Sequence, residues 1–200
     1  MNAMNCLQIL RDVKDVAFAT VDKNGHPQVR IIDVMIVENE KLYFCTARGK
    51  DFFQQLSAND QVAVTGMNKE YQMVRLSGKA RRLSLQHEWI DRIFEENPSM
   101  NDVYPGDSRY ILEPFCIADG EVEFFDLGQA PIVRESFRLG NYVCPEKGFE
   151  ITNQCIQCGK CERICPQQCI KNFTINQKHC LHCGLCVEEC PIGAIKKRGE

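Results

Sequence analysis

The C-terminal part of the chain is dominated by Cys155-Ile-Gln-Cys158-Gly-Lys-Cys161-Glu-Arg-Ile-Cys165-Pro166, which recurs 25 residues later as Cys180-Leu-His-Cys183-Gly-Leu-Cys186-Val-Glu-Glu-Cys190-Pro191. Each run places three cysteines at C-x-x-C-x-x-C spacing and a fourth directly before a proline. Such self-similarity indicates a duplicated structural unit.

The repeat aligns further positions outside the cysteines. Cys169 falls opposite Ala194, so we expect it where the fold favours a small side chain and not as a ligand. Gly159 and Gly184 coincide, and glycine lets a backbone wrap closely around a bound group because it has no Cβ. Ile170 and Ile195 also coincide, and we expect them to shield that group from water.

The spacing resembles that of bacterial two-cluster ferredoxins, in which the cysteine before proline ligates the other run's cluster. The resemblance implies a small α+β ferredoxin-like domain over residues 144–200 with two [4Fe–4S] clusters. It assigns one cluster to Cys155, Cys158, Cys161 and Cys190, and the other to Cys180, Cys183, Cys186 and Cys165. Zinc sites need only four ligands, usually two separated pairs, and disulfides need an oxidising compartment. Both remain alternatives.

Length and charge divide the chain in two. The protein has 200 residues and a net charge of −3. Residues 1–140 carry 16 basic and 21 acidic side chains, whereas residues 141–200 carry 8 and 6. No basic region is large enough to suggest nucleic-acid binding. Gly and Pro punctuate the middle, so we expect a domain over residues 1–127 and a linker over residues 128–143 that packs along both domains.

The N-terminal segment is polar and amphipathic, without the continuous apolar run of a signal peptide or a membrane span. We therefore expect a cytoplasmic protein whose cysteines stay reduced. Four cysteines outside the repeats then have no assigned role beyond that of small hydrophobic side chains: Cys6, Cys45, Cys116 and Cys144.

Residues 1–127 change from a helical period to a period of two. A first helix, capped by Asn5, is expected to place Leu7, Leu10 and Val13 on one face. Asn24-Gly25 is a strong hairpin signal. The pattern predicts strands over residues 16–21, 28–37, 42–45, 61–67, 71–83, 110–118 and 122–127, and helices over residues 50–57 and 84–97, the latter capped by Ser84. This set is mainly β with α and indicates a small antiparallel barrel.

Three stretches within these strands resemble the pyridoxamine 5′-phosphate oxidase-like family of split β-barrels. They are Val16-Ala-Phe-Ala-Thr-Val through Gly25-His-Pro-Gln-Val-Arg30-Ile-Ile, Leu42-Tyr-Phe-Cys-Thr46-Ala-Arg-Gly-Lys50, and Val74-Arg-Leu-Ser-Gly78-Lys-Ala80. The likeness covers about residues 5–127 and implies FMN bound at the interface of a twofold homodimer.

The resemblance places the phosphate-binding loop on Thr46, Arg48, Gly49 and Lys50, the flavin-contacting strand on Arg30, Ile31 and Ile32, and Gln72 near the flavin ring. A flavin phosphate needs several charge-assisted donors, and this loop offers a hydroxyl, a guanidinium and an ammonium group. The alternative for the loop is a solvated turn before a helix. A deazaflavin or a haem remains a possible occupant of the barrel.

The chain departs from the true oxidase after the barrel, because Arg134-Glu-Ser-Phe-Arg138-Leu-Gly140 replaces an arginine-rich end that grips the substrate phosphate. Pyridoxine phosphate is therefore not expected as the substrate. Oxygen is not expected as the electron acceptor either, because exposed [4Fe–4S] clusters are oxygen-labile, and this favours an anaerobic host. No catalytic residue can be assigned.

Clusters pass single electrons, whereas flavin passes one or two. The sequence therefore predicts an iron–sulfur flavoprotein, an oxidoreductase that reduces an unidentified small acceptor with electrons from a low-potential donor such as a ferredoxin or an associated oxidoreductase. Two alternatives remain: an electron-carrier subunit without its own substrate, and a redox or oxygen sensor.

Overall fold

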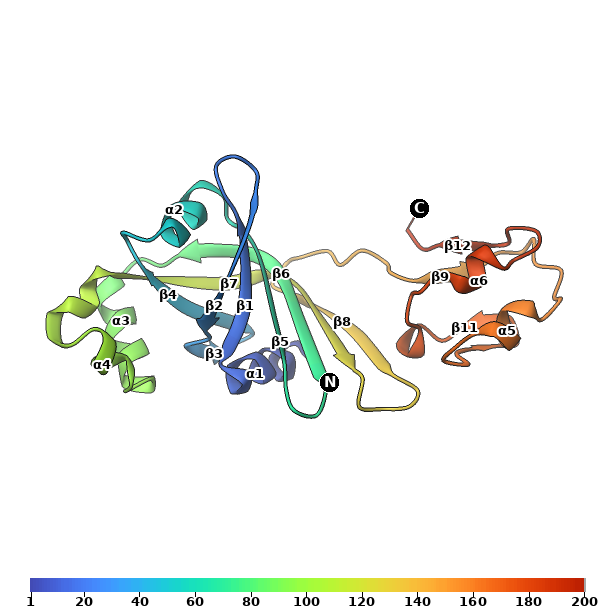
Figure 1. The fold of residues 1–200 in the computed structure, drawn as a ribbon, viewed down its shortest axis with the longest axis horizontal. Coiled ribbons are helices and arrows are strands. Elements are labelled where there is room, and N and C mark those ends of the chain that lie inside the picture. Colours follow the sequence, from blue (N-terminus) through green and yellow to red (C-terminus); the bar gives the residue numbers. More distant parts are fainter. Residues whose placement is uncertain (200) are drawn as a thin grey trace.

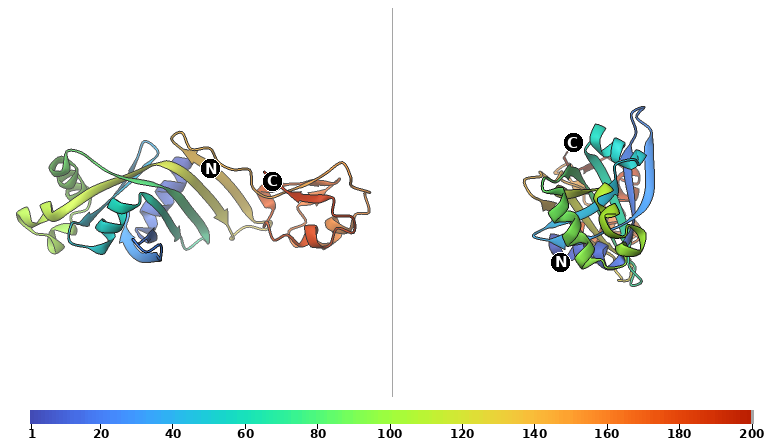
Figure 2. Two further views of the ribbon diagram at one scale, coloured as in Figure 1. Left: turned by 90° about the horizontal axis from the view of Figure 1, so that it is seen from above. Right: turned by 90° about the vertical axis from the view of Figure 1, so that its left-hand side faces the viewer.

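The molecule is elongated and has two lobes, described over residues 1–199 of a computed structural model (Figure 1). The N-terminal lobe is a mainly β split barrel, and the C-terminal lobe is small, α+β and rich in cysteine. Figure 2 shows the same end-to-end arrangement when the molecule is turned by 90°. The fold class expected from the sequence is thus confirmed.

One antiparallel sheet forms the barrel lobe, with the strand order β2-β1-β5-β6-β7-β4-β3 and with β8 paired to β7. The edges of this path are β2 and β3. The strands are β1 (Asp15–Val21), β2 (Pro27–Asp33), β3 (Ile36–Glu38), β4 (Lys41–Ala47), β5 (Gln61–Met67), β6 (Gln72–Arg82), β7 (Leu112–Asp126) and β8 (Val133–Leu139).

Short helices cover the barrel: α1 (Ala3–Val13), α2 (Asp51–Ala58), α3 (Gln86–Glu96), α4 (Met100–Val103) and the 3-10 helix η1 (Gly106–Ile111). Two predicted caps are wrong. Asn2, not Asn5, caps α1, because its side chain accepts a hydrogen bond from the Asn5 N–H. Leu85, in a left-handed conformation, precedes α3 without a side-chain cap.

Two apolar clusters stabilise this lobe on opposite faces of the sheet. The inner cluster joins Leu7 and Leu10 of α1 and Phe52 of α2 to the barrel interior around Phe18 and Phe44. The outer cluster packs Ile90, Ile93 and Phe94 of α3 against the other face of β4 and β7. The alternation of apolar side chains along the strands separates these two layers.

A single strand, β7, replaces two predicted strands. It runs for 15 residues and pairs with β4 through Leu112–Ile117, and with β8 through Gly120–Asp126. Asp119-Gly120 looks like a turn in the sequence, but here the register against β6 shifts, between Lys79 and Ala80. A Cβ on Gly120 would collide with the Ser77 carbonyl oxygen, so the close approach of β6 and β7 requires glycine.

Residues 128–143, expected to be a linker, contain β8. Its apolar residues alternate, with Val133 and Leu139 buried and Phe137 packed against the inner core. The glycines and prolines on either side of β8 obscure this period-two pattern in the sequence. The sheet therefore extends beyond the predicted domain boundary at residue 127.

The cysteine-rich lobe repeats at the level of the backbone. It contains β9 (Phe149–Ile151), α5 (Lys160–Ile164), β10 (Ile170–Lys171), β11 (Thr174–Ile175), the 3-10 helix η2 (Gln177–His179), α6 (Leu185–Glu188) and β12 (Ile195–Lys197). Positive φ angles recur 25 residues apart, at Gln157 and His182, Gly159 and Gly184, and Gln168 and Gly193. The two cysteine runs therefore share one backbone path.

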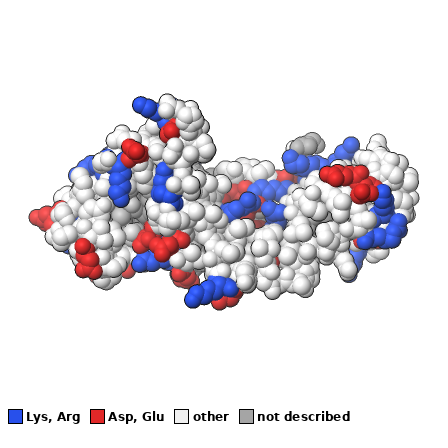
Figure 3. Space-filling view, viewed as in Figure 1, with Lys and Arg blue, Asp and Glu red and all other residues white. Residues whose placement is uncertain are grey.

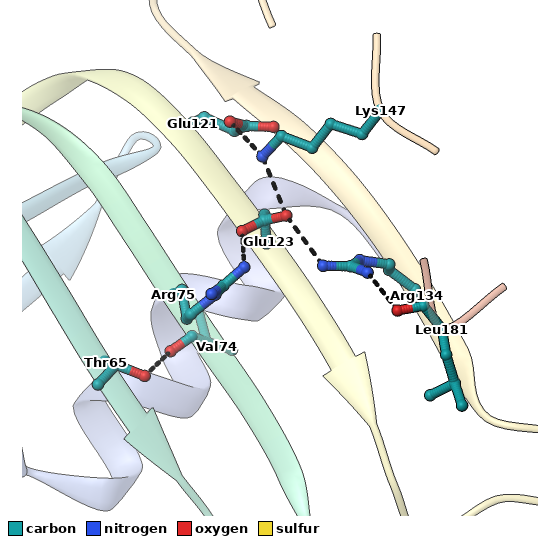
Figure 4. A network of polar contacts seen from close by, with 8 residues as sticks. All are labelled: Thr65, Val74, Arg75, Glu121, Glu123, Arg134, Lys147 and Leu181. Carbon is teal, nitrogen blue, oxygen red and sulfur yellow. Dashed lines mark hydrogen bonds and ion pairs between the residues drawn. The ribbon is translucent and has the colours of Figure 1, made fainter. Parts of the chain in front are cut away.

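The two lobes meet at a network of charged side chains (Figure 4). Glu123 of β7 forms ion pairs with Arg75 of β6, with Arg134 of β8 at 3.6 Å and with Lys147 at 3.0 Å. Arg134 also donates to the Leu181 carbonyl oxygen at 3.4 Å, which ties β8 to the second cysteine run. Burial would raise the pKa of Glu123, but the three cations outweigh burial and lower it.

Further contacts between the lobes come from the segment just before and within β8. The Ile132 N–H donates to Gln167 at 3.1 Å, the Ile132 carbonyl contacts His179 at 2.8 Å, and Lys178 pairs with Glu135 at 3.0 Å. The second run is therefore the one that faces the barrel.

Basic and acidic side chains are interspersed on the face of the molecule shown in Figure 3. Among residues 1–199, every helix is too short or too polar to cross a membrane.

Candidate cofactor sites

Eight cysteines sort into two cavities of nearly equal size in the C-terminal lobe. One cavity, of about 340 Å³ including its open mouth, is lined by Cys155, Cys158 and Cys161 of the first run and by Cys190 of the second. The structure thus brings together the four residues expected to share a cluster, including the one supplied across the repeat.

The other cavity, of about 330 Å³ including its mouth, is lined by Cys180, Cys183 and Cys186 together with Cys165 of the first run. Ile170 lines this cavity and Ile195 lines the other, and both side chains are buried, as expected for residues that shield a bound group. Within residues 1–199, no group of three His, Cys, Asp or Glu side chains lies in a position to hold a single metal ion. Four thiols around each cavity are a donor set that fits an iron–sulfur cluster.

Backbone N–H groups point at several of these sulfurs. The Gln157 and His182 N–H groups donate at 3.4 Å to the Sγ atoms of Cys155 and Cys180, at equivalent places in the repeat. The Ala194 N–H donates to Cys190 Sγ at 3.2 Å. Hydrogen bonds from the backbone to a thiolate stabilise its charge, so these turns favour the form that binds metal.

The pKa of Cys190 is lowered by the N–H groups of the turn that follows it, that of Ile192 above all. The pKa of Cys165, at the equivalent position, is also lowered: burial opposes this, but hydrogen bonds from Cys169 and the following turn outweigh burial. By contrast, burial raises the pKa of Cys186 to about 11. Backbone hydrogen bonds thus lower the pKa of both cysteines that cross between the runs.

Cys169 lies in the second cavity as a fifth cysteine. Its Sγ is 3.5 Å from Cys165 Sγ, and the residue is buried. Its repeat partner Ala194 is also buried and lines the first cavity. The structure therefore places Cys169 at the small, enclosed position that the repeat predicts, with a thiol where the other cavity has a methyl group.

The barrel lobe holds an unpaired buried hydroxyl at the end of β4. Thr46 is 3% exposed, and its Oγ1 has no hydrogen-bond partner in residues 1–199. A buried polar atom without a partner is costly unless a bound group supplies one. The residues that follow, Arg48, Gly49 and Lys50, form the turn into α2, and a Cβ on Gly49 would meet no atom within 4 Å. The orphaned hydroxyl and the open turn fit a phosphate group.

The predicted flavin-contacting residues of β2 point in different directions. Arg30 turns inward beneath α2 and donates to Thr20 Oγ1 at 2.5 Å and to Gln55 Oε1 at 2.7 Å, with its guanidinium over the Phe52 ring. Burial lowers the pKa of Arg30. Ile32 packs against the inner core, whereas Ile31 is 64% exposed on the edge strand.

Gln72 is not brought to this loop. It begins β6 and bonds to Asn68 and to Asp126 at the end of β7, whereas the loop adjoins the start of β7. Ten residues of β6 separate it from Arg82, about 30 Å of extended strand. Within one chain, Gln72 and the loop therefore belong to opposite ends of the barrel.

Two charged residues beside the loop were missed in the sequence. Glu113 of β7 is almost fully buried and accepts from both Arg48 and Arg82. Only the strand register brings these residues together, and the local pattern around Glu113-Pro114 gives no sign of it.

Two family matches agree with the two lobes. Residues 5–102 match the pyridoxamine 5′-phosphate oxidase family, and residues 173–196 match the 4Fe-4S binding domain. No match was found among curated proteins.

Solved structures resemble the barrel lobe. A NimC/NimA family protein from Clostridium acetobutylicum is 26% identical, with a TM-score of 0.58, and the match covers 68% of this chain and 91% of that one. A protein related to general stress protein 26, from the same organism, is 13% identical, with a TM-score of 0.54, 68% coverage of this chain and 95% of that one. A heme binding protein from Mycobacterium smegmatis is 12% identical, with a TM-score of 0.52, 68% coverage of this chain and 57% of that one. The last two show similarity of fold alone.

Proposed function

We propose that this chain, which joins a pyridoxamine 5′-phosphate oxidase-like FMN-binding split barrel to a 4Fe-4S ferredoxin-type domain, is an iron–sulfur flavoprotein that carries electrons between two [4Fe–4S] clusters and FMN. The observation that carries the proposal is the pair of cavities in the C-terminal lobe, each lined by three cysteines of one run and by the cysteine that precedes proline in the other run.

The cluster of the first run is inferred from the chain itself, because the 4Fe-4S family match covers only residues 173–196, which hold the second run. The first run has the same spacing, the same positive φ angles and the same N–H to sulfur bond at its first cysteine. Four matching cysteines on matching backbone paths support a [4Fe–4S] cluster in each cavity.

In the barrel, Thr46, Arg48 and Lys50 would hold the FMN phosphate, and Arg30 lies beneath α2, where it donates to Gln55. When bound, FMN supplies an exchange between one-electron and two-electron chemistry. A chain that holds both kinds of redox group suits the reduction of a small acceptor by a low-potential donor, such as a ferredoxin or an associated oxidoreductase. Thiols that must stay reduced suit the cytoplasm.

A homodimer is part of this proposal. The edge strand β2 exposes Val29 and Ile31, at 71% and 64%, on the side away from the barrel core. The distance between the two proposed cofactor sites within one chain also matters. The phosphate-binding loop adjoins Glu113 near the start of β7, whereas the cysteine-rich lobe contacts β8 at Arg134, which pairs with Phe125 near the end of β7. Twelve residues of β7 separate these points, about 40 Å. A second chain that covers β2 would bury these two apolar side chains.

The test is an anaerobic preparation with iron, acid-labile sulfide and extracted flavin measured together. The proposal expects about eight irons and eight sulfides per chain and a bound FMN. Stoichiometric zinc in place of iron, or a barrel that binds haem and no flavin, would overturn it. Four irons would reduce the proposal to one cluster.

A second assay separates a reductase from an electron carrier. The reduced protein is mixed anaerobically with small acceptors in one series and with redox proteins in another. Turnover of a small acceptor supports the reductase, and reduction of protein partners alone supports the carrier subunit.

A further inference from the structure

The carboxylate of Glu113 holds two arginines. Its Oε1 accepts from Arg48 Nη1 and its Oε2 from Arg82 Nε, both at 2.8 Å. The Glu113 side chain is 1% exposed, whereas those of Arg48 and Arg82 are 44% and 54% exposed. A buried anion therefore fixes two guanidinium groups whose remaining N–H donors face solvent.

The strand register places these groups beside the orphaned hydroxyl. Thr46 pairs with Glu113 across β4 and β7, and Arg82 of β6 pairs with Phe115. Residues two apart on a strand share a face, so Thr46, Glu113 and Arg82 lie on one face of the sheet.

The helix α2 covers the same face. The Arg82 guanidinium lies 5.7 Å from the centre of the Phe53 ring, and that ring packs edge-on against Phe115. Lys50 directly precedes α2. The loop and Arg82 thus border one region from two directions.

Charge balance shows what Arg82 adds. A phosphate monoester carries about −1.5 to −2 near neutral pH. Glu113 cancels the charge of Arg48, so the loop residues alone would leave only Lys50 to balance the phosphate. With Arg82 included, the three cations and one carboxylate carry a net charge of +2, which matches the phosphate.

We propose that Arg82 is a further ligand of the flavin phosphate and that Glu113 is a positioning residue that sets Arg48 and Arg82 at the spacing of its oxygens. The proposal rests on FMN binding by the barrel, as proposed above. Arg82 presents a planar fork that matches phosphate oxygens, and pairing with Glu113 reduces the mobility of that fork.

The test compares FMN with riboflavin, which lacks the phosphate, on the full-length protein after removal of flavin under anaerobic conditions. Arg82→Gln should weaken FMN binding at least tenfold, the equivalent of one lost charge-assisted bond, and change riboflavin binding less than twofold. Arg82→Lys should restore part of the FMN affinity. Arg81→Gln is the matched control, because Arg81 is the exposed neighbour on β6, paired with Asp119, and should change neither affinity.

Glu113→Gln separates positioning from simple charge. If Glu113 were only a nearby negative charge, its neutralisation would tighten FMN binding. If Glu113 is a positioning residue, removing its negative charge should weaken FMN binding, because Arg48 and Arg82 lose their shared anionic partner and repel each other. Unchanged riboflavin binding would show that the barrel of the variant is folded.

The outcomes distinguish the two levels of the proposal. A wild-type protein that binds neither flavin overturns FMN binding itself. A wild-type protein that prefers FMN to riboflavin, with Arg82→Gln indistinguishable from it, overturns only the role of Arg82. Tighter FMN binding by Glu113→Gln overturns the role of Glu113.

Discussion

Thr20 and Thr46 present the same hydroxyl in two different situations within one barrel. Both residues are buried. Thr20 Oγ1 donates to Gln55 Oε1 at 2.5 Å and accepts from Arg30, whereas Thr46 Oγ1 has no partner in the described chain. A hydroxyl of the first kind stabilises the fold, whereas an unpaired buried hydroxyl of the second kind destabilises the protein and is free to bond a ligand.

Thr46→Val should therefore stabilise the flavin-free barrel by about 1 kcal/mol, because it removes a buried unpaired hydroxyl at nearly constant volume. It should also weaken FMN binding. Denaturant unfolding followed by the fluorescence of Trp89, the single tryptophan, measures the first effect, and flavin titration measures the second.

The matched control is Thr20→Val, which should destabilise the barrel by about 1–3 kcal/mol because Gln55 and Arg30 lose a buried partner. Equal destabilisation by both substitutions would contradict the assignment of Thr46 to a ligand site.

Cys169 makes the two cavities chemically unequal, since a thiol stands where the first cavity has the methyl group of Ala194. Cys169→Ala should leave the iron content at about eight per chain, because four other cysteines surround the second cavity. It should shift the reduction potential of that cluster to a more negative value, because Cys165 Sγ loses a nearby S–H group.

Iron and sulfide analysis and a redox titration followed by electron paramagnetic resonance measure these two effects. Loss of a whole cluster in Cys169→Ala would make Cys169 a ligand and contradict the pairing across the repeat.

At the scale of elements, β8 connects the lobes through Arg134, and Glu123 of β7 is its anionic partner (Figure 4). Glu123→Gln leaves Arg75, Arg134 and Lys147 facing a neutral amide. The free energy of local opening at β8 should fall by about 1–3 kcal/mol, measured by hydrogen exchange of its amides at neutral pH.

Glu135→Gln is the control for this change, because the pair between Glu135 and Lys178 also crosses between the lobes but is more exposed. Its effect should stay below about 0.5 kcal/mol. Equal exchange rates in Glu123→Gln and the wild type would mean that the apolar contacts of β8, and not the charged network, hold the two lobes together.

The elements also show what the sequence could and could not predict. The strand at Gln61–Met67 has the predicted bounds, because its pattern is local. The continuity of β7 was missed because Asp119-Gly120 resembles a turn until its pairing with Lys79 and Gly78 is known. Glu113 and Arg82 were missed for the same reason: their meeting depends on the register of strands far apart in the sequence. The cysteines that line the two cavities could be predicted from the repeat, because the spacing of such ligands is a local property of a short stretch of chain.

At the scale of the whole molecule, the proposed homodimer should sediment with a mass near twice 22.9 kDa. Placing a charge on the edge strand, as in Ile31→Asp, should shift the protein toward monomer, because a second chain would have to bury that carboxylate. Val143→Asp is the control, at a residue that is 85% exposed outside the barrel sheet. A wild-type monomer that still binds FMN would contradict the assembly but not the flavin.

The two lobes should also be separable in function. Arg48→Ala together with Lys50→Ala should lower FMN affinity by roughly 10²-fold or more, because two charged donors are lost. The absorption of the clusters should remain, since their ligands lie in the other lobe. Transfer to a small acceptor should then stop, and continued turnover at the wild-type rate would reduce the barrel to a scaffold.

A protein engineer who grafts the cysteine-rich lobe onto another barrel would have to carry β8 with it. A cut at residue 127 takes from β7 its partner over Gly120–Asp126 and leaves half of a strand ladder open. A cut after Leu139 takes from the lobe the contacts of Ile132, Arg134 and Glu135. Either cut removes contacts that one of the two lobes needs. A gene rearrangement that preserves both lobes must therefore keep β8 joined to each of them.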